Sequence, residues 1–590
     1  MEYEVSKEKL KDYAAKLMFD MDDSEYETLQ EEFRTILKQM DLIENIPNIK
    51  DVLPMSFPFI TYEAHLRKDE VILDDTLTVN EVLTNCKHQY NDQVNYQRWW
   101  NKMKYNIQDK TITDLRKDLD NGVVTSEELF NESVDLANKF QADYNAFVTI
   151  LSKYKMKKKK DTLITGIPYA LKDNFSTSGI LTTGSSNIMK DYVPVYDATS
   201  YKKLRDAGAV LVGKTVLDEL AMGGTGTTGH TGVVKNPYDI TRQIGGSSAG
   251  SAAAVSLGIV PFALGSDTGD SIRKPASFGG VVGFKPTYGR ISRYGLFAFA
   301  SSLDHVGTFT KTVEDAAILT DILKGSDYHD MTSLKDDGKS YLDSINNDIS
   351  NRKLFYIKEI CDRNLYKDVD DKELHEVLDK FYILLDKCRE AGFTVEEVSI
   401  DKRLLEAIYP SYMTISCAEA TSNNANLTGI QFGVRGEGNT PEEIMFDART
   451  KGFSELIKRR FVLGSYILQK ENQERLYLNA CRVRRLIVEK INELFKEYDG
   501  MILPASGGIA PKFDDSSDKL SDRYLLLENH MAIANFGGFP SITIPYAKVS
   551  SMPVGVNITG RILEDDVVLN MANKIEEVTG FKGNWRDKDV

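Results

Sequence analysis

Apolar residues recur with helical spacing near the start of the chain, where they form two stripes. The first stripe comprises Leu10, Tyr13, Ala14, Leu17 and Met18, and the second comprises Leu29, Phe33, Ile36, Leu37 and Met40. This spacing predicts two amphipathic helices between residues 5 and 43, and Ser24 with Glu27 predicts a capping box between them. Residues 45–85 break the pattern with three prolines and a charged stretch, which predicts an extended arm. Two short helices and an arm cannot bury much apolar surface alone.

Further along, helical patterns alternate with short apolar runs. Amphipathic helices are predicted to begin near Ile112 and Thr125, and residues 216–222 also have a helical pattern. Apolar runs bounded by Gly or Pro predict strands at residues 167–171, 209–212 and 259–264, and two more follow near the C-terminus at 541–546 and 554–558. This alternation predicts an α/β fold in which helices cover a mixed or parallel sheet.

The composition is that of an ordinary globular protein, with 42% hydrophobic and 27% charged residues. A net charge of −15 argues against a free-standing role on nucleic acid, because phosphate binding depends on Lys and Arg. Any nucleic acid is therefore expected to be held by a partner. The lysine-rich run at residues 153–160 is interpreted as a solvated loop rather than a nucleic-acid site.

Cysteine usage and hydropathy indicate the compartment. The five cysteines are far apart and form no Cys-x-x-Cys pair, which favours a reducing environment. The N-terminal residues are acidic rather than apolar or Arg-rich, so no signal or transit peptide is expected. No uninterrupted apolar run approaches the ~18 residues that a membrane helix needs. We therefore expect a cytoplasmic protein without a membrane segment.

Nucleotide and metal sites find little support in the sequence. Residues 224–229 match the glycine pattern of dinucleotide-binding loops, but they follow a predicted helix and no lysine is placed to meet a phosphate. The seven histidines show no metal-ligand spacing, so no metal site is expected. A Ser-His-Asp triad stays open, because its members meet only in space.

One lysine and two serines are the strongest candidates for catalysis. Lys172 ends the apolar run at 167–171, where burial disfavours an ammonium and lowers the pKa of a lysine. Ser247 lies in a glycine-rich turn, and a hydroxyl can accept from one group while it donates to another. Ser271 would then be a nucleophile whose proton passes through Ser247 to Lys172. Strand alternation is expected to turn Asp173 away from the amine. The alternative for the glycine-rich turn is a flexible loop.

Ser271 is predicted to follow a strand and to open a helix, since Pro275 is tolerated near the first helical turn. Backbone N–H groups at such a terminus point toward a developing anion. Thr268, Gly269 and Asp270 are therefore expected to form an oxyanion hole.

The side chain of Asp270 is a potential problem for this arrangement. An ionised carboxylate beside the oxyanion would repel it, by about 4 kcal/mol at ~4 Å and an effective dielectric of ~20. We therefore expect the Asp270 side chain to turn outward, toward Arg273 or Lys274.

These motifs resemble those of the amidase signature family, whose members cleave amides with a Ser-Ser-Lys triad and no histidine. The resemblance spans residues 111–575 and includes the stretch 283–304. It implies a mixed central sheet covered by helices on both faces. Ser271 would be the nucleophile, Ser247 the relay and Lys172 the base, with no cofactor in this chain.

The stretch 283–304 is similar in particular to the A subunit of the tRNA-dependent amidotransferases. That similarity implies that glutamine is the substrate, held by Tyr412, Arg460 and Glu528. Arg460 would clamp the α-carboxylate through two hydrogen bonds. The alternative is that Arg459 and Arg460 are simply exposed charges on a helix.

Three positions depart from the family. Glu528 stands where the family has an aspartate, and Asp270 and Ala249 stand where it usually has glycine. These departures motivate one alternative function, a catalytically silent scaffold. A second alternative is a stand-alone amidase that acts on another small amide.

The N-terminal pattern resembles the C subunit of the same enzymes, a small protein that clasps its amidase partner. We therefore predict a helical clasp with an extended arm at residues 1–95, a junction at 96–110 and an amidase domain at 111–590. The alternative is an ordinary helical extension of the enzyme. The resemblance further implies that ammonia passes to the B subunit, which binds ATP and Mg²⁺ and amidates a mischarged Glu-tRNA(Gln) or Asp-tRNA(Asn).

Overall fold

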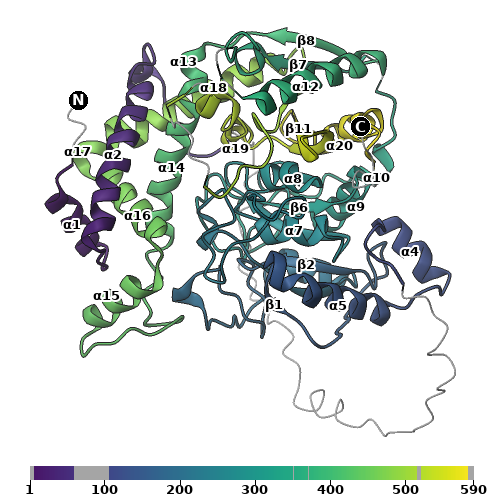
Figure 1. Ribbon diagram of the computed structural model, residues 1–590, viewed down its shortest axis with the longest axis horizontal. Helices are drawn as coiled ribbons and strands as arrows, with labels where there is room; N and C mark the ends of the chain where they lie inside the picture. The colour runs from purple at the N-terminus through teal and green to yellow at the C-terminus, as the bar shows by residue number, and fades with distance from the viewer. Residues whose placement is uncertain are drawn as a thin grey trace, which may run out of the picture. The chain divides into compact units, whose positions relative to one another are not determined.

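The computed structural model describes residues 5–58, 105–349, 351–367, 369, 371–514, 520–521 and 523–582. The described residues up to 58 and from 107 onward belong to one compact unit. Figure 1 shows the order of its helices and strands along the chain.

The helices of the described residues are α1 (Lys7–Lys16), α2 (Asp23–Glu44), α4 (Ile112–Asp120), α5 (Ser126–Tyr144), α6 (Thr199–Asp206), α7 (Ala249–Ser256), α8 (Arg273–Gly279), α9 (Val313–Leu323), α10 (Tyr341–Ser344), α11 (Lys358–Cys361), α12 (Lys372–Glu390), α13 (Lys402–Glu406), α14 (Ile408–Asn423), α15 (Pro441–Gly452), α16 (Glu455–Leu468), α17 (Lys470–Gln473), α18 (Asn479–Leu494), α19 (Ala532–Gly537) and α20 (Asp565–Thr579). The shorter helical turns are η1 (Ile49–Asp51), η3 (Asn187–Met189), η4 (Glu219–Ala221), η5 (Glu474–Leu478) and η6 (Arg523–Leu527). The strands are β1 (Phe147–Ile150), β2 (Pro168–Lys172), β3 (Val210–Thr215), β4 (Phe262–Asp267), β5 (Val282–Lys285), β6 (His305–Thr310), β7 (Lys353–Ile357), β8 (Thr394–Val398), β9 (Gly500–Pro504), β10 (Ser541–Val549) and β11 (Met552–Gly560).

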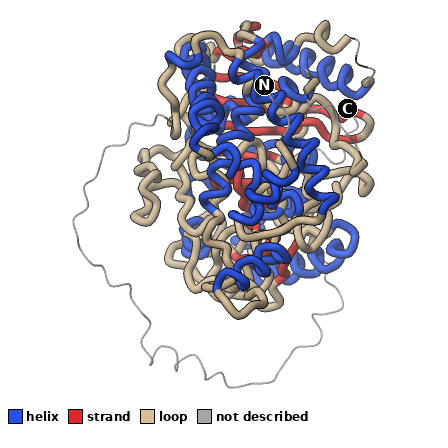
Figure 2. Tube along the Cα trace, turned by 90° about the vertical axis from the view of Figure 1, so that its left-hand side faces the viewer, coloured by secondary structure: helices blue, strands red, loops and turns tan. Residues whose placement is uncertain are grey.

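The strands of the described residues form one sheet of eleven in the order β1-β3-β2-β4-β6-β5-β10-β11-β9-β7-β8. β2 runs parallel to both β3 and β4, whereas β4 and β6 run antiparallel. The sheet is therefore mixed, as the resemblance implied. In Figure 2 the strands run through the interior and helices surround them.

Helices cover both faces of this sheet (Figure 2), and α8 and α12 both contact β10. Ser541 at the start of β10 accepts a hydrogen bond from Arg273 of α8. Tyr546 of the same strand instead donates its hydroxyl to the Val377 carbonyl of α12. Helices α8 and α12 therefore both pack against β10, a strand in the middle of the sheet.

Three local expectations are corrected. β4 begins at Phe262 rather than residue 259, because Pro261 has no N–H to give to a strand. Residues 216–222 do not form a helix, since only the short turn η4 lies there and Leu220 has a left-handed φ of 51°. The cap of α2 is Asp22 rather than Ser24, and the Asp22 N–H donates to the Glu25 carboxylate at 3.0 Å.

The two N-terminal helices form as expected and pack on the C-terminal half of the chain. Tyr466 of α16 receives two rings edge-on, Tyr13 of α1 with ring centroids 6.2 Å apart and Phe33 of α2 at 5.5 Å. The arm is described only as far as residue 58. The rest of the arm to residue 95 and most of the junction at 96–110 lie outside the described residues, so the division into domains stays a prediction. Within the described part of the chain, every helix is too short or too polar to span a bilayer.

Candidate active site

Lys172 ends β2, a strand paired on both edges, and its side chain is completely buried. Its Nζ lies 2.8 Å from Ser247 Oγ, 2.9 Å from Ser248 Oγ and 2.8 Å from Ser266 Oγ. Three hydroxyls therefore surround one amine. No carboxylate pairs with Lys172 among the described residues.

Burial sets the protonation state of Lys172. Desolvation lowers the pKa of this lysine to about 7, against the opposing charges of Asp218, Asp267 and Asp304. A lysine with this pKa can be neutral near neutral pH and so can act as a base. The Ser248 hydroxyl donates to the Ser266 carbonyl at 3.1 Å, so its hydrogen is already used. The Ser247 hydroxyl is one that can still donate to a neutral amine.

Asp173 points away from this amine, which confirms the expectation from strand alternation. Its carboxylate accepts from the Thr183 backbone N–H at 2.8 Å and lies 3.5 Å from Lys214 Nζ. Burial lowers the pKa of Lys214 to about 8, in spite of the Asp173 charge. Asp173 and Lys214 therefore form a buried pair beside Lys172.

The loop that resembles a dinucleotide-binding site has another role. The N–H groups of residues 225–228 all donate to the Asp218 carboxylate, at 3.0 to 3.3 Å. The Asp218 N–H in turn donates to the Ser247 carbonyl at 3.1 Å. A Cβ at Gly246 would lie 2.0 Å from Asp218 Oδ2, so the chain needs glycine there. The loop binds an internal carboxylate, and this contact holds the turn that carries Ser247.

Ser271 lies next to the same turn. Its carbonyl accepts the Ser248 N–H at 3.2 Å, and its side chain is buried. Among the described residues, no hydrogen bond joins Ser271 Oγ to Ser247 Oγ. The structure thus contains the expected hydrogen bond between Lys172 and Ser247. Ser271 lies beside Ser247, but the expected hydrogen bond between their hydroxyls is not formed.

The residues before Ser271 form a loop between β4 and α8. Within the described part of the chain, the backbone N–H groups of Thr268, Gly269, Asp270 and Ser271 form no backbone hydrogen bond. The Thr268 hydroxyl donates to Asp304 at 2.7 Å. Helix α8 begins at Arg273, two residues after Ser271 rather than at it. Pro275 lies in its first turn, as expected.

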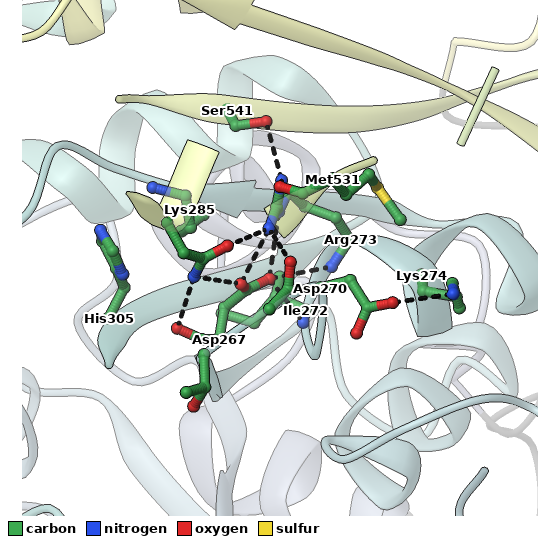
Figure 3. Close-up of polar contacts among 12 residues, drawn as sticks. Asp267, Asp270, Ile272, Arg273, Lys274, Lys285, His305, Met531 and Ser541 are labelled. Carbon is green, nitrogen blue, oxygen red and sulfur yellow. Dashed lines mark hydrogen bonds and ion pairs between the residues drawn. The ribbon is translucent and has the colours of Figure 1, made fainter. Parts of the chain in front are cut away.

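Arg273 anchors this loop from inside the protein (Figure 3). Its guanidinium binds the Asp267 carboxylate twice, at 3.0 and 3.1 Å, and the Gly269 carbonyl at 2.7 Å. Asn535 accepts from Arg273 at 2.7 Å and donates to Asp267 at 2.9 Å. Burial opposes ionisation of Asp267, but Arg273 holds the pKa of that carboxyl below its usual range.

Asp270 turns outward, as expected, and its partner is Lys274 rather than Arg273. The Asp270 carboxylate lies 2.8 Å from Lys274 Nζ, a contact visible in Figure 3. Lys274 also donates to the Glu528 carbonyl at 2.6 Å. Burial alone would lower the pKa of Lys274, but the charges of Asp270 and Glu528 raise it.

The expected glutamine-binding residues lie around this loop. A Cβ at Gly269 would meet the Tyr412 ring at 2.9 Å, so the ring of Tyr412 packs directly on the loop. The Glu528 carboxylate accepts the Gly507 N–H at 3.2 Å and lies 3.6 Å from Arg523.

Arg459 and Arg460 are not equivalent, although they are neighbours on α16. Arg459 pairs with Glu32 of α2 at 3.1 Å. Arg460 instead lies against the sulfur of Met413 at 3.7 Å and beneath the Phe299 ring. Its Nε is buried without a hydrogen-bond partner among the described residues. The alternative of two exposed helix charges is therefore wrong, because neither side chain is exposed.

A family model decides the classification, because the model described as "Amidase" matches residues 128–569. The chain belongs to the amidase family. A second model, described as "Glu-tRNAGln amidotransferase C subunit", matches residues 21–94 of this amidase.

Relatives of the amidase support the same classification. The A subunit of glutamyl-tRNA(Gln) amidotransferase from Sulfolobus acidocaldarius is 36% identical over 80% of this chain and 98% of that protein. Its counterpart in Halothermothrix orenii is 38% identical over 81% and 98%. The crystal structure of the counterpart from Thermotoga maritima is 35% identical, covers 81% of this chain and 96% of that chain, and superposes with a TM-score of 0.67.

Several polar residues of the amidase site escaped the sequence analysis. Ser248 and Ser266 contact Lys172, while Asp218, Arg273 and Asn535 hold the two loops. Ser248 could have been found, because it is adjacent to Ser247 in the same motif. No sequence signal marks Asn535, which lies far along the chain from the loop it binds.

Proposed function

We propose that the protein is the glutamine-hydrolysing subunit of a tRNA-dependent amidotransferase. The observation that carries the proposal is the buried Lys172 amine, which lies 2.8 Å from Ser247 Oγ and has a pKa of about 7. A neutral lysine amine can take the proton of a serine without histidine.

In the proposed reaction, Ser271 Oγ attacks the side-chain amide carbon of glutamine. Its proton moves to Ser247 Oγ while the Ser247 proton moves to Lys172 Nζ. The C–N bond then breaks, and the leaving nitrogen takes a proton back through the same relay and departs as ammonia. Water hydrolyses the resulting γ-glutamyl ester on Ser271 with the same relay, releasing glutamate and restoring the serine.

The oxyanion would be held by backbone N–H groups of the loop at Thr268, Gly269 and Asp270. Losing one such donor typically costs about 2.7–4 kcal/mol of transition-state stabilisation. Arg273 keeps these groups available, because it draws the Gly269 carbonyl to the opposite side of the loop. The outward Asp270 carboxylate keeps negative charge away from the intermediate.

Glutamine would be bound by Tyr412, Arg460 and Glu528. Arg460 lacks a carboxylate partner in the described part of the chain, so the substrate α-carboxylate can pair with it through two hydrogen bonds. Glu528 would contact the α-ammonium, and its greater length compared with aspartate is accommodated by its hydrogen bond to the Gly507 N–H.

The proposed partner is the B subunit of the amidotransferase, a kinase and transferase that would bind ATP and Mg²⁺ and use the ammonia to amidate a mischarged tRNA. Relatives at 36–38% identity are named as the A subunit of glutamyl-tRNA(Gln) amidotransferase. The N-terminal segment would take the place of a separate C subunit, because it belongs to the same chain as the amidase domain. A net charge of −15 is consistent with tRNA being held by the partner.

A cytoplasmic location is part of the proposal. The four described cysteines are buried and free, which fits a reducing compartment: Cys361, Cys388, Cys417 and Cys481. Fluorescence microscopy of the tagged chain would check the location.

The proposal is tested by recovering the tagged chain from cell extract and assaying the recovered assembly for glutaminase activity. A co-purifying protein with ATP-dependent tRNA amidation, supplied by glutamine, is the expected result. Turnover of a simpler amide by the chain alone, with glutamine left intact, would favour a stand-alone amidase. An assembly that still amidates tRNA from glutamine when Ser271 is replaced by alanine would favour a silent scaffold.

A further inference from the structure

Arg484 of α18 is a fully buried guanidinium with acceptors from three separate parts of the chain. It donates to the Phe536 carbonyl at 3.0 Å and to both the carbonyl and the hydroxyl of Ser302, each at 3.0 Å. It also donates to the Ser56 carbonyl at 2.9 Å. The N-terminal segment therefore supplies one acceptor for a charge that lies inside the amidase domain.

The segment at residues 52–58 is bound along α18 by its backbone. The Met55 N–H donates to the Cys481 carbonyl at 3.1 Å, and the Met55 side chain is buried. Arg482 donates to the Val52 carbonyl at 2.9 Å. The Met55 contacts hold the next residue, Ser56, in place to accept from Arg484, whereas Arg482 contacts the segment four residues before Ser56.

The first route from Arg484 to the active site passes through Ser302. Both the N–H and the hydroxyl of Ser302 donate to the Glu419 carboxylate, at 2.9 and 2.6 Å. Two residues further, the Asp304 carboxylate accepts the Thr268 hydroxyl at 2.7 Å. Moving Ser302 would therefore move a support of the proposed oxyanion loop.

The second route passes through α19. Arg484 binds the Phe536 carbonyl, and the preceding residue, Asn535, donates to both the backbone and the side chain of Asp267. Asn535 also accepts from Arg273, which holds the Gly269 carbonyl. Both routes converge on the loop at residues 267–271.

We propose that Arg484 is a positioning residue through which the docked N-terminal segment sets the geometry of the loop at 267–271. The inference rests on the proposed function, because the loop's work is to stabilise the oxyanion. If the segment detaches, Arg484 loses the Ser56 acceptor, and only Ser302 and Phe536 are left to position its guanidinium. Glutamine hydrolysis would then depend on a segment that never touches glutamine.

Arg482 offers a matched control on the same helix. It binds the same segment through Val52, and its other partners are Asn479 at 2.8 Å and Glu474 at 2.8 Å. None of these contacts reaches Ser302 or Phe536. A general loosening of α18 would affect both arginines alike, whereas positioning of the loop requires Arg484 alone.

The test compares Arg484→Lys, Met55→Ala and Arg482→Gln in the full-length chain with its partner. Arg484→Lys keeps the charge but cannot reach three acceptors at once. We expect both Arg484→Lys and Met55→Ala to lower kcat for glutamine hydrolysis at least tenfold, with KM changed less than twofold. The double variant should lose little more than either single variant. Arg482→Gln should change kcat and KM less than twofold.

The outcomes separate this inference from the proposed function. If the wild-type protein has no glutaminase activity with its partner, the proposed function itself is wrong. Active wild-type protein with a Met55→Ala variant of normal kcat and normal thermal unfolding would overturn the positioning role of Arg484. A rise in KM at constant kcat, or an equal loss in Arg482→Gln, would overturn it as well. If Arg484→Lys fails to fold, Met55→Ala and Ser302→Ala carry the same comparison.

Discussion

Lys172 Nζ and Ser247 Oγ lie 2.8 Å apart in an interior that excludes water from the amine. This contact joins β2 to a turn that comes much later in the chain. The amine has no carboxylate partner among the described residues. Its closest hydrogen-bond partners are therefore the hydroxyls of Ser247, Ser248 and Ser266, and proton transfer to it would come from Ser247. A positive charge on Lys172 would end its use as a base.

The pH dependence of glutamine hydrolysis should follow the protonation of Lys172. The base must be neutral, and burial lowers the pKa of Lys172 to about 7. We expect kcat/KM to rise about tenfold per pH unit below pH 7 and to level off about one unit above it. Steady-state kinetics across this range measure the midpoint.

Two variants assign that midpoint to Lys172. Asp304→Asn removes a charge that raises the pKa of Lys172, so the midpoint should move to lower pH. Glu219 is a buried carboxyl with a pKa of about 7, so it could produce a similar profile. Glu219→Gln should leave the midpoint in place. If the midpoint disappears in Glu219→Gln, the pH profile reports the titration of Glu219 and not that of Lys172.

Replacement of Ser271 should abolish only the glutamine-dependent reaction. Ser271→Ala removes the proposed nucleophile, and such losses are on the order of 10³-fold or more. Amidation of tRNA by the assembly from added ammonia should stay within about twofold of wild type, because ammonia bypasses the ester. Parallel assays with glutamine and with ammonia as the nitrogen donor compare the two rates of tRNA amidation. Intact amidation from glutamine would identify the chain as a scaffold.

The two neighbouring arginines of α16 should behave differently. Arg460→Ala removes a charge-assisted contact worth about 1.5–3 kcal/mol, so kcat/KM for glutamine should fall roughly 10- to 100-fold. Arg459→Ala removes a partly exposed pair with Glu32 and should leave kcat/KM within about twofold of wild type. Equal effects of the two variants on glutamine kinetics would contradict the assignment of Arg460.

Removing the Asp270 carboxylate should have little effect on turnover. The carboxylate pairs with Lys274 at 2.8 Å and so faces away from the reaction. We expect Asp270→Gly to change kcat less than about tenfold, whereas a charge of ~4 kcal/mol facing the oxyanion would give several hundredfold. A hundredfold increase in the variant would show that the carboxylate faces the intermediate after all.

The sequence predicted the parts of the site that depend on local pattern. The apolar run before Lys172 predicted a buried strand, and the depressed pKa of Lys172 follows from that burial alone. Alternation along the same strand correctly placed Asp173 on the other side. The outward turn of Asp270 followed from charge repulsion, although the choice between Arg273 and Lys274 needed coordinates.

Contacts between distant segments could not be predicted in this way. Arg273 was expected only as a partner of Asp270, and its contact with Asn535, 262 positions later, could not be predicted. The glycine pattern at 224–229 invited a phosphate, but the fold brings the Asp218 carboxylate to the same N–H groups. In both cases the chemistry is ordinary, and only the topology of the sheet decides which groups meet.

The N-terminal stripes illustrate the same limit and lead to a prediction of stability. The spacing of Leu29 and Phe33 predicted an apolar helix face, but it could not identify Tyr466 as a residue that packs against that face. Phe33 is fully buried, so Phe33→Ala should lower the free energy of unfolding by about 3–5 kcal/mol. Thr28→Ala, at an exposed position on the same helix, should change it by less than about 0.5 kcal/mol.

Denaturant unfolding followed by fluorescence and by circular dichroism measures both variants. If α2 unfolds together with the amidase body, the whole transition of Phe33→Ala should shift to lower denaturant. An additional early transition confined to a small signal change would mean that the N-terminal helices unfold separately. The helices would then be a docked module, held by the ring contacts with Tyr466 but not required for the stability of the sheet.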